Sequence, residues 1–327
     1  MRNSTIATIT EALVNGDEEG LSYETADQVA HAENSDLIDL FFAAHKVTQR
    51  FKKKQIFTCA IINAKSGSCS QDCAFCAQSA YHETGIKPHP LLEKDPMVAD
   101  AESMWQAGAS RYSLVTSGLR LRNSELDRIA DTTSAIRKRT GLAVCTSLGT
   151  LTPSMARKLK ESGVTTYHHN LETAESFFGH ICTTHAYAED IETLRVAKSK
   201  GLQVCSGGIL GMGESWAQRL ELAFTLRQLD VDCIPINFLN PIPGTKLAHR
   251  KPLWSWEALK CIALVRLINP KTDITICGGR EITLKDYQSW VFFAGANGLM
   301  IGNYLTTQGR NIEADMAMIR DMERCRG

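Results

Sequence analysis

The sequence from residue 56 onward alternates between short apolar segments and amphipathic helical segments, and it repeats this order eight times. Apolar strands that alternate with helices favour parallel pairing, because each helix carries the chain back to the same edge of the sheet. Eight strand–helix units over roughly 270 residues predict an α/β fold of the (β/α)8 TIM-barrel type, with a doubly wound open sheet as the alternative. The predicted strands are Ile56–Asn63, Arg111–Thr116, Leu142–Ser147, Thr165–Leu171, Leu202–Gly207, Cys233–Leu239, Asp273–Cys277 and Gly298–Ile301.

Helical patterns follow the strands, and a further helical region precedes the first strand. Residues 1–53 lack a strand signal; Ser22 is placed to cap one helix, and Asp36–Phe51 carries an apolar stripe. We therefore expect an N-terminal helical extension over residues 1–53 that covers one end of a barrel domain over residues 54–327. The barrel helices are predicted at Met97–Ala107, Ser124–Arg139, Pro153–Ser162, Tyr187–Lys200, Trp216–Leu229, Trp254–Leu267, Leu284–Phe293 and Ile312–Met322.

Composition restricts the classes of function. The formal net charge is zero, so neither a nucleic-acid groove nor an anionic membrane surface is expected as a partner. No apolar run approaches the ~18 residues that a membrane span needs, and the N-terminus lacks the pattern of a signal peptide. The chain contains 11 cysteines, and without a secretion signal metal binding is a better use for them than disulfides. We expect a reduced, cytoplasmic protein.

Three of the cysteines, Cys69, Cys73 and Cys76, follow the first predicted strand with C-x3-C-x2-C spacing. Three thiolates can hold three corners of a [4Fe–4S] cube and leave the fourth iron open. Two alternatives are buried cysteines on one helix face and a structural zinc with His82 as a further ligand. The serine, glycine and aspartate residues around the thiols favour a loop over a helix. A barrel places this loop at the carboxyl ends of the strands, where active sites form.

The loop resembles the signature of the radical S-adenosylmethionine (SAM) superfamily, in which an aromatic residue such as Phe75 precedes the last cysteine. The resemblance implies that the open iron binds the amino and carboxylate groups of SAM. It further implies that an electron from the cluster cleaves SAM to a 5′-deoxyadenosyl radical.

Four further cysteines lie on alternate predicted strands. Alternate strands contribute side chains to a common layer inside a barrel, so four thiols there can coordinate a second Fe–S cluster, although any one alone is more often packing. These four are Cys59, Cys145, Cys205 and Cys277. The remaining cysteines occur on loops, helices or a strand start and are interpreted as structural; they are Cys182, Cys233, Cys261 and Cys325.

Polar residues and glycines follow strands four and five. Asn170 and Glu172 share a strand face, which suits hydrogen bonds to a ribose diol and to polar substrate groups; a helix N-cap beside a solvated acid is the alternative. Gly207 and Gly208 are expected to expose their backbone to a close ligand, such as the adenine or methionine part of SAM.

Strands six and eight offer neutral hydrogen-bonding groups. Asn237 lies on strand six, and Thr306 and Thr307 follow strand eight. Amide and hydroxyl groups suit an uncharged polar head such as a cyclic urea.

Together these segments resemble the biotin synthase family over residues 50–310. The most specific pieces are the three-cysteine loop, Tyr167–Thr173, Val204–Ile209, Gly279–Glu281 and Leu305–Thr307. The resemblance implies a radical SAM barrel, generally homodimeric, that inserts sulfur from an auxiliary Fe–S cluster into dethiobiotin, with a flavodoxin or ferredoxin as electron donor. It also implies that Asn170 and Glu172 bind SAM or bridge it to substrate, and that Asn237 with Thr306 or Thr307 faces dethiobiotin.

The chain departs from that family in its auxiliary ligands. Ser113 stands on strand two where the family has a cysteine, while Cys59 and Cys277 are thiols that the family lacks. Arg280 is kept at the place of the family's arginine ligand, but four thiolates no longer require it. We therefore predict an auxiliary cluster of four irons rather than [2Fe–2S], with Ser113 and Arg280 beside it. Its predicted ligands are Cys59, Cys145, Cys205 and Cys277.

A second departure concerns SAM. Asp190 stands where the family has an arginine thought to contact the SAM carboxylate, and Arg195 on the same helix is expected to take its place. Two other functions stay open: another radical SAM enzyme of this barrel type, such as a hydrogenase-cofactor maturase, and a non-catalytic protein that binds zinc or stores metal. Dethiobiotin turnover separates the first from a biotin synthase, and metal and sulfide analysis separates the second.

Overall fold

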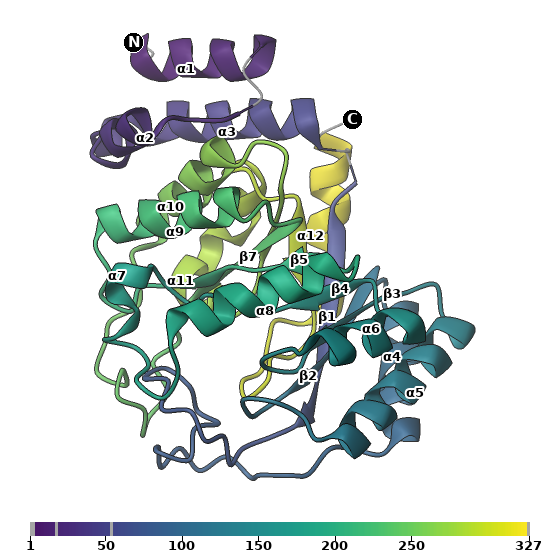
Figure 1. Ribbon diagram of the computed structural model, residues 1–327. Coiled ribbons are helices and arrows are strands. Elements are labelled where there is room, and N and C mark those ends of the chain that lie inside the picture. The colour runs from purple at the N-terminus through teal and green to yellow at the C-terminus, as the bar shows by residue number, and fades with distance from the viewer. Residues whose placement is uncertain (1–3, 17–18, 53–54, 326–327) are drawn as a thin grey trace.

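The computed structural model describes residues 4–16, 19–52 and 55–325, and these residues form a closed parallel β-barrel surrounded by helices (Figure 1). The strand order is β5-β4-β3-β2-β1-β9-β8-β7-β6, and a further pairing between β5 and β7 closes the barrel. The predicted (β/α)8 barrel is therefore confirmed, and the open sheet is wrong. The strands are β1 (Phe57–Lys65), β2 (Arg111–Thr116), β3 (Ala143–Ser147), β4 (Thr166–His168), β5 (Gln203–Cys205), β6 (Gly208–Leu210), β7 (Cys233–Phe238), β8 (Asp273–Ile276) and β9 (Gly298–Met300).

The fifth strand position is divided into β5 and β6 because the chain is pressed against its neighbour there. A Cβ atom on Gly207 would lie 2.0 Å from the carbonyl oxygen of Pro235 on β7, so only glycine fits at this crossing. The ladder with β7 is interrupted at that point and resumes at Gly208, which pairs with Ile236.

The helices around the barrel follow the sequence pattern closely. Thr152 accepts a hydrogen bond from the Met155 amide at the start of α6, and Gly163 ends that helix in a left-handed conformation with φ of 99°. The predicted helix at Leu284–Phe293 is instead a 3-10 segment, η2 (Lys285–Phe292), preceded by the short α11 (Arg280–Leu284). The other barrel helices are α4 (Lys94–Gln106), α5 (Asn123–Arg139), α6 (Pro153–Ser162), α7 (Glu175–Phe178), α8 (Tyr187–Ser199), α9 (Trp216–Gln228), α10 (Ser255–Ile268) and α12 (Ile312–Cys325).

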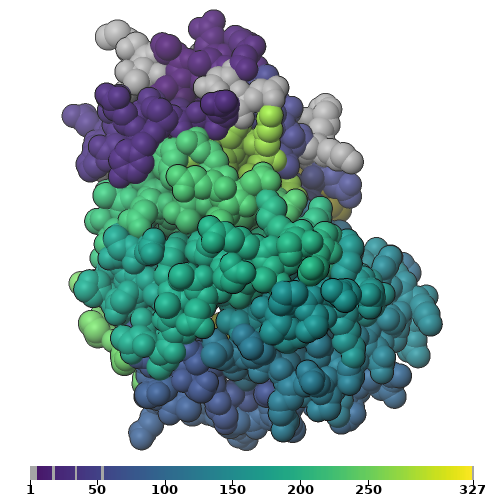
Figure 2. Space-filling model, viewed as in Figure 1, coloured from purple at the N-terminus to yellow at the C-terminus, as the bar shows by residue number. Residues whose placement is uncertain are grey.

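The N-terminal helices cap the end of the barrel opposite the loop that follows β1 (Figures 1 and 2). They are α1 (Ser4–Asn15), α2 (Tyr23–Ala30), η1 (Asn34–Asp36) and α3 (Leu37–Phe51). Ser22 caps α2 through a 3.2 Å hydrogen bond from the Thr25 amide, as expected. Phe41 of α3 packs against Trp256 and Trp290 with ring centroids 5.9 and 6.3 Å apart, so the cap and the barrel share one apolar core.

The helices have lengths and compositions suited to packing on the barrel. Within the described residues, none is long and apolar enough to cross a membrane.

Phe41→Ala should lower the free energy of unfolding of the whole chain by about 3 to 5 kcal/mol, because it leaves a cavity between the cap and the barrel. Chemical denaturation of the apoprotein, followed by circular dichroism, measures this loss. Phe42→Ala is the matched control: that ring is 42% exposed, and its removal should cost less than about 1 kcal/mol. Equal effects of the two substitutions would contradict the shared core.

Candidate active site

The three-cysteine loop leaves β1 at the carboxyl end of the barrel. Gly67 turns the chain with φ of +74°, and a Cβ atom there would lie 2.8 Å from that of Pro88. The loop closes on itself through hydrogen bonds from the Cys69 amide to the Gln78 carbonyl and from the Ala80 amide to the Cys69 carbonyl. The thiols thus lie in an ordered loop at the rim, and the alternative of core cysteines on one helix face is wrong. We call Cys69, Cys73 and Cys76 the rim thiols.

The rim thiols fit an iron–sulfur cube better than a single zinc ion. His82 points its Nδ1 atom at the Cys76 carbonyl oxygen, 2.9 Å away. Across the described part of the chain, no three His, Cys, Asp or Glu side chains converge on one metal position. A cube does not require such convergence, since each thiolate binds a different iron.

A second segment, Cys182–His185, clamps the loop from the side of α8. The Asp72 carboxylate accepts hydrogen bonds from the Thr183 amide (2.8 Å) and hydroxyl (2.6 Å). Burial raises the pKa of Asp72, but these bonds outweigh it and hold the pKa well below its usual range. The Thr184 hydroxyl donates to Gln71 Oε1 at 2.8 Å. The backbone between the first two rim thiols is therefore held by an ionised carboxylate and an amide.

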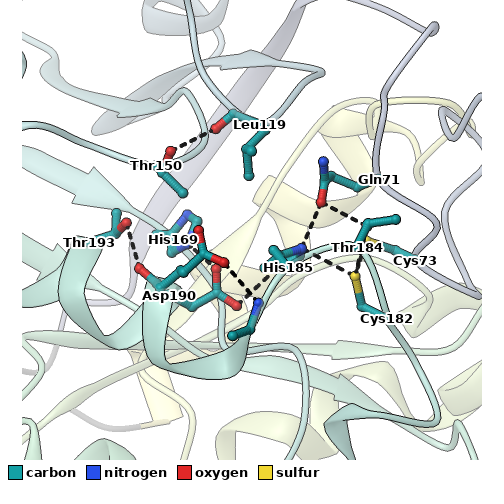
Figure 3. Close-up of polar contacts among 12 residues, drawn as sticks. Gln71, Cys73, Leu119, Thr150, His169, Cys182, Thr184, His185, Asp190 and Thr193 are labelled. Atoms are coloured by element: carbon teal, nitrogen blue, oxygen red, sulfur yellow. Dashed lines mark hydrogen bonds and ion pairs between the residues drawn. The ribbon is translucent and has the colours of Figure 1, made fainter.

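The same segment brings to the loop an unpredicted thiol, Cys182, and one histidine, His185 (Figure 3). Cys182 Sγ lies 3.9 Å from Cys73 Sγ and 3.2 Å from His185 Nδ1. The buried Asp190 carboxylate lies between His169 Nε2 (2.7 Å) and His185 Nε2 (3.3 Å). Its hydrogen bond raises the pKa of His185, which favours the protonated form of this imidazole beside the rim.

The structure corrects the expectation for Arg195. Its side chain is exposed on α8, whereas Asp190 on the same helix is buried toward the barrel. Five residues advance an α-helix by about 140° beyond a full turn, which carries Arg195 to the outer face. His185, 2.8 Å from Gln71 Oε1, and Lys246, 3.5 Å from the Asp72 carboxylate, are basic groups next to the loop, whereas Arg195 is not.

One cavity of about 290 Å³ runs from the rim into the barrel, and most of the residues singled out from the sequence line it. The roles of these residues remain predictions, but their common location is observed. Those on the wall are Cys59, Phe75, Cys76, Ser113, Cys145, Asn170, Glu172, Cys205, Asn237, Cys277, Thr306 and Thr307.

Gly207 and Gly208 are not on the cavity wall, which corrects the expectation of an exposed backbone. The Gly207 amide donates to Asn170 Oδ1 at 3.2 Å, and its carbonyl accepts from the Leu171 amide at 3.0 Å. A Cβ atom on Gly208 would lie 2.4 Å from the Glu172 carbonyl oxygen. Gly208 lets β6 approach the segment that follows β4, and the Gly207 amide holds Asn170, so the two glycines help to fix where Asn170 and Glu172 lie.

Cys59, Cys145, Cys205 and Cys277, which we call the inner thiols, all lie on the cavity wall deep in the barrel. Burial raises the pKa of Cys145 to about 11 and that of Cys277 to about 12. Without metal these groups are protonated at neutral pH, and binding of metal must release those protons.

Sequence reasoning missed Cys233, which lies on the same wall. A hydrogen bond with Cys233 is the first cause of the raised pKa of Cys205, and after burial the charge of Cys233 is the largest influence on Cys59. The signal was available, because Asn237 was placed facing inward and side chains on a strand alternate with period two. Cys233, Pro235 and Asn237 line the cavity together.

Arg111 was also missed as a residue of the cavity wall. Arg111 lines the cavity and donates to Asp273 at 2.8 Å, below the inner thiols.

Arg280 does not lie on the cavity wall beside the inner thiols, where it was expected. It is fully buried outside that wall and pairs with Asp315 of α12. Gly279 turns left-handed with φ of 77° to begin α11, and this turn directs Arg280 toward α12. The charge of Arg280 still acts on Cys277 and opposes the effect of burial on its pKa.

The upper wall carries hydrogen-bonding groups held in fixed orientations. Asn237 accepts from the Gly278 amide at 3.0 Å and donates to the Gly208 carbonyl at 3.3 Å. Burial and then the charge of Asp190 raise the pKa of Glu172 to about 8.

Among the described residues, the cavity-lining hydroxyls of Ser113 and Thr275 are buried without a hydrogen-bond partner. Unpaired hydroxyls beside an interior cavity fit a site that takes a polar ligand.

Comparison with known proteins gives matches over the whole barrel. The profile of the Radical SAM superfamily matches residues 65–226, and that of the Biotin and Thiamin Synthesis associated domain matches residues 235–324. The biotin synthase of Syntrophus aciditrophicus (strain SB) is 52% identical over 318 residues, which cover 97% of this chain and 98% of that one. The biotin synthase of Geobacter metallireducens is 51% identical over 322 residues, covering 98% and 97%.

Solved structures give the same fold at lower identity. Methylornithine synthase superposes with a TM-score of 0.84 and 19% identity over 96% of each chain. A maturase of the [FeFe]-hydrogenase superposes with a TM-score of 0.82 and 16% identity over 97% of this chain and 74% of that one. At this identity the likeness concerns the fold alone.

Asp72→Asn should loosen the clamp on the rim thiols. A hydrogen bond to a charged group contributes about 1.5 kcal/mol or more, so iron bound by the rim thiols should be lost to a chelator about tenfold faster. Anaerobic reconstitution followed by timed chelation measures the rate. Asp95→Asn, at an exposed carboxylate on α4, is the control and should leave the rate unchanged. Equal rates in the two variants would show that the clamp does not stabilise the loop.

Proposed function

Because the chain belongs to the biotin synthase family, we propose that it converts dethiobiotin to biotin by SAM-dependent radical insertion of sulfur. The observation that carries this proposal is one cavity with thiols at two depths: Cys76 of the rim thiols lines it, and the inner thiols line it inside the barrel. A substrate held between them can meet a radical source at one end and a sulfur source at the other. The matches to the Radical SAM superfamily and to biotin synthases support the same reaction.

We propose that the rim thiols hold a [4Fe–4S] cluster and that SAM lies beside Phe75, Asn170 and Glu172, where the cavity opens. When bound, the cluster and SAM supply a 5′-deoxyadenosyl radical that abstracts hydrogen from the substrate. The chain itself orients these groups and excludes water: the clamp fixes the loop, and the barrel wall encloses the cavity. Asn170 donates to Glu172 at 3.3 Å, which orients the carboxylate at the mouth.

The inner thiols are proposed to hold an auxiliary cluster of four irons, with Ser113 beside it and Arg280 acting by charge from outside the wall. This cluster supplies the sulfur. Four buried thiols on alternate strands match its donor chemistry, and their protonated state without metal keeps the empty barrel free of buried negative charge.

Dethiobiotin is proposed to lie above the inner thiols. Asn237, Thr306 and Thr307 offer amide and hydroxyl groups on the cavity wall, which suit the uncharged cyclic urea of this substrate. We further propose a homodimer in the cytoplasm that receives electrons from a small protein such as a flavodoxin or ferredoxin.

Conversion of dethiobiotin to biotin by the anaerobically reconstituted protein tests the function. Cys205→Ala should reduce biotin formed per chain at least a hundredfold while SAM cleavage continues, because Cys205 belongs to the sulfur site and not to the rim. Ser113→Cys tests whether a thiol on β2 is compatible with the auxiliary cluster, and it should retain turnover. Cys261→Ala, at a buried cysteine of α10, is the matched control.

Unchanged biotin formation by Cys205→Ala would contradict the sulfur site. If the wild-type protein cleaves SAM but forms no biotin, the reaction belongs to another radical SAM enzyme. Iron and acid-labile sulfide near zero, with zinc bound instead, would indicate a metal-binding protein.

The affinity for SAM should depend on the ionisation of Glu172. SAM carries a positive sulfonium, so the ionised carboxylate attracts it and the protonated acid does not. With a pKa of about 8, affinity should fall roughly tenfold between pH 8.5 and pH 7. Anaerobic binding titrations measure this dependence. Glu172→Gln should bind more weakly and lose this part of the pH dependence, while titration of the ligand's own amine affects both proteins. Parallel pH profiles would contradict the role of Glu172.

A further inference from the structure

Cys233 lies on the cavity wall next to the inner thiols. It is the direct register partner of Cys205, in the pairing of β5 with β7 that closes the barrel. Neighbouring strands lie about 4.8 Å apart, and both side chains face the same cavity. Two thiols at such a position can reach the same metal centre.

The levels of the inner thiols follow from the strand registers. Cys59 pairs with Arg111 on β2, and Arg111 pairs with Ala143 on β3. Because strands in a (β/α)8 barrel are tilted, the level rises by about one residue per strand, so Cys145 rather than Ala143 lies level with Cys59. The same rise of one residue per strand, continued from β3 through β4 to β5, puts Cys205 in this layer.

The fourth residue of that layer is Thr275 on β8, which is not a cysteine. Cys277 is the next inward position along β8, one step nearer the cavity mouth. Cys233 lies on β7, between the strand of Cys205 and the strand of Thr275, just below the layer. It therefore approaches the three level thiols more closely than Cys277 does.

The surrounding charges agree with this placement. Cys233 lines the same cavity as Cys59, Cys205 and Cys277, so it belongs to the same group of thiols. Arg111 lies on the cavity wall at the depth of Cys233, and its charge interacts with Cys233 and Cys59. Its salt bridge to Asp273 holds the guanidinium beneath these two thiols. A guanidinium is suited to balance the negative charge that several thiolates and sulfides bring into a buried site.

We propose that Cys233 is a fifth thiolate ligand of the deeper iron–sulfur cluster, beside Cys205 and above the cationic Arg111. The proposal rests on the auxiliary cluster of the proposed function and adds a residue to it. A fifth thiolate gives the cluster one ligand more than four irons require. Cys233 would then keep iron on the Cys205 side bound after the cluster has given up a sulfur atom.

The test isolates the deeper site by removing the rim thiols. The parent protein is Cys69→Ala/Cys73→Ala/Cys76→Ala, and iron and sulfide per chain are measured after anaerobic reconstitution, with electron paramagnetic resonance of the reduced protein. Adding Cys233→Ala should lower bound iron or speed its loss to a chelator at least tenfold, and adding Cys205→Ala should have the same effect. Adding Cys261→Ala should leave both unchanged.

Cys233→Ser separates ligation from folding, because serine is nearly isosteric with cysteine. It should change the resonance spectrum of the deeper cluster while the far-ultraviolet circular dichroism of the apoprotein stays that of the parent. Parent-like iron content, release rate and spectrum in both Cys233 variants, together with loss in Cys205→Ala, would overturn the assignment of Cys233 alone. A parent that takes up no iron would overturn the deeper cluster itself, and Cys233 as its ligand with it.

Discussion

The barrel is closed where the fifth strand, formed by β5 and β6, pairs with β7, and the site depends on this closure. The pair of β5 with β7 is Cys205 opposite Cys233, so the closure itself sets these two thiols side by side. Closure is possible because Gly207 lets the backbone of the fifth strand pass against Pro235, where any side chain would clash. The constraint that completes the fold thus also brings together the deepest thiols.

Polar contacts hold the elements together at both ends of the cavity. At the lower end, Asp273 pairs with Lys52 at 2.7 Å and with Arg111 at 2.8 Å, which ties the N-terminal cap to the barrel floor. At the rim, Asp72 and Gln71 tie the cysteine loop to the segment before α8. Asp72 is buried and Asp273 is half-buried, and each carboxylate is satisfied by several donors, as burial of charge requires. The thiols of the cavity wall lie between these two tied ends.

The sequence alone was sufficient for the fold, and most of the site residues that it singled out lie on the cavity wall, because both follow largely from periodicity. Alternation of strands and helices indicates the barrel, and alternation within strands places Cys59, Cys145 and Asn237 inward. It was less informative where the chain leaves regular structure. Cys182 sits in a loop whose approach to Cys73 depends on contacts more than a hundred residues apart in sequence, and no local pattern signals it. Arg280 follows a left-handed turn that only the glycine before it permits.

The electrostatics of the cavity explain how one barrel can hold so many ionisable groups before its cofactors bind. Burial raises the pKa values of the thiols, so they are neutral in the empty barrel, and the carboxylate of Glu172 is largely protonated near neutral pH for the same reason. Binding of iron at one depth and of a cation at the other would replace these protons with positive charge that lies in nearly the same place. The cavity is then electrically balanced in both states, and its low dielectric strengthens the attraction to the incoming cations. A barrel whose thiols and carboxylate were already ionised would carry uncompensated buried charge and be less stable without its cofactors.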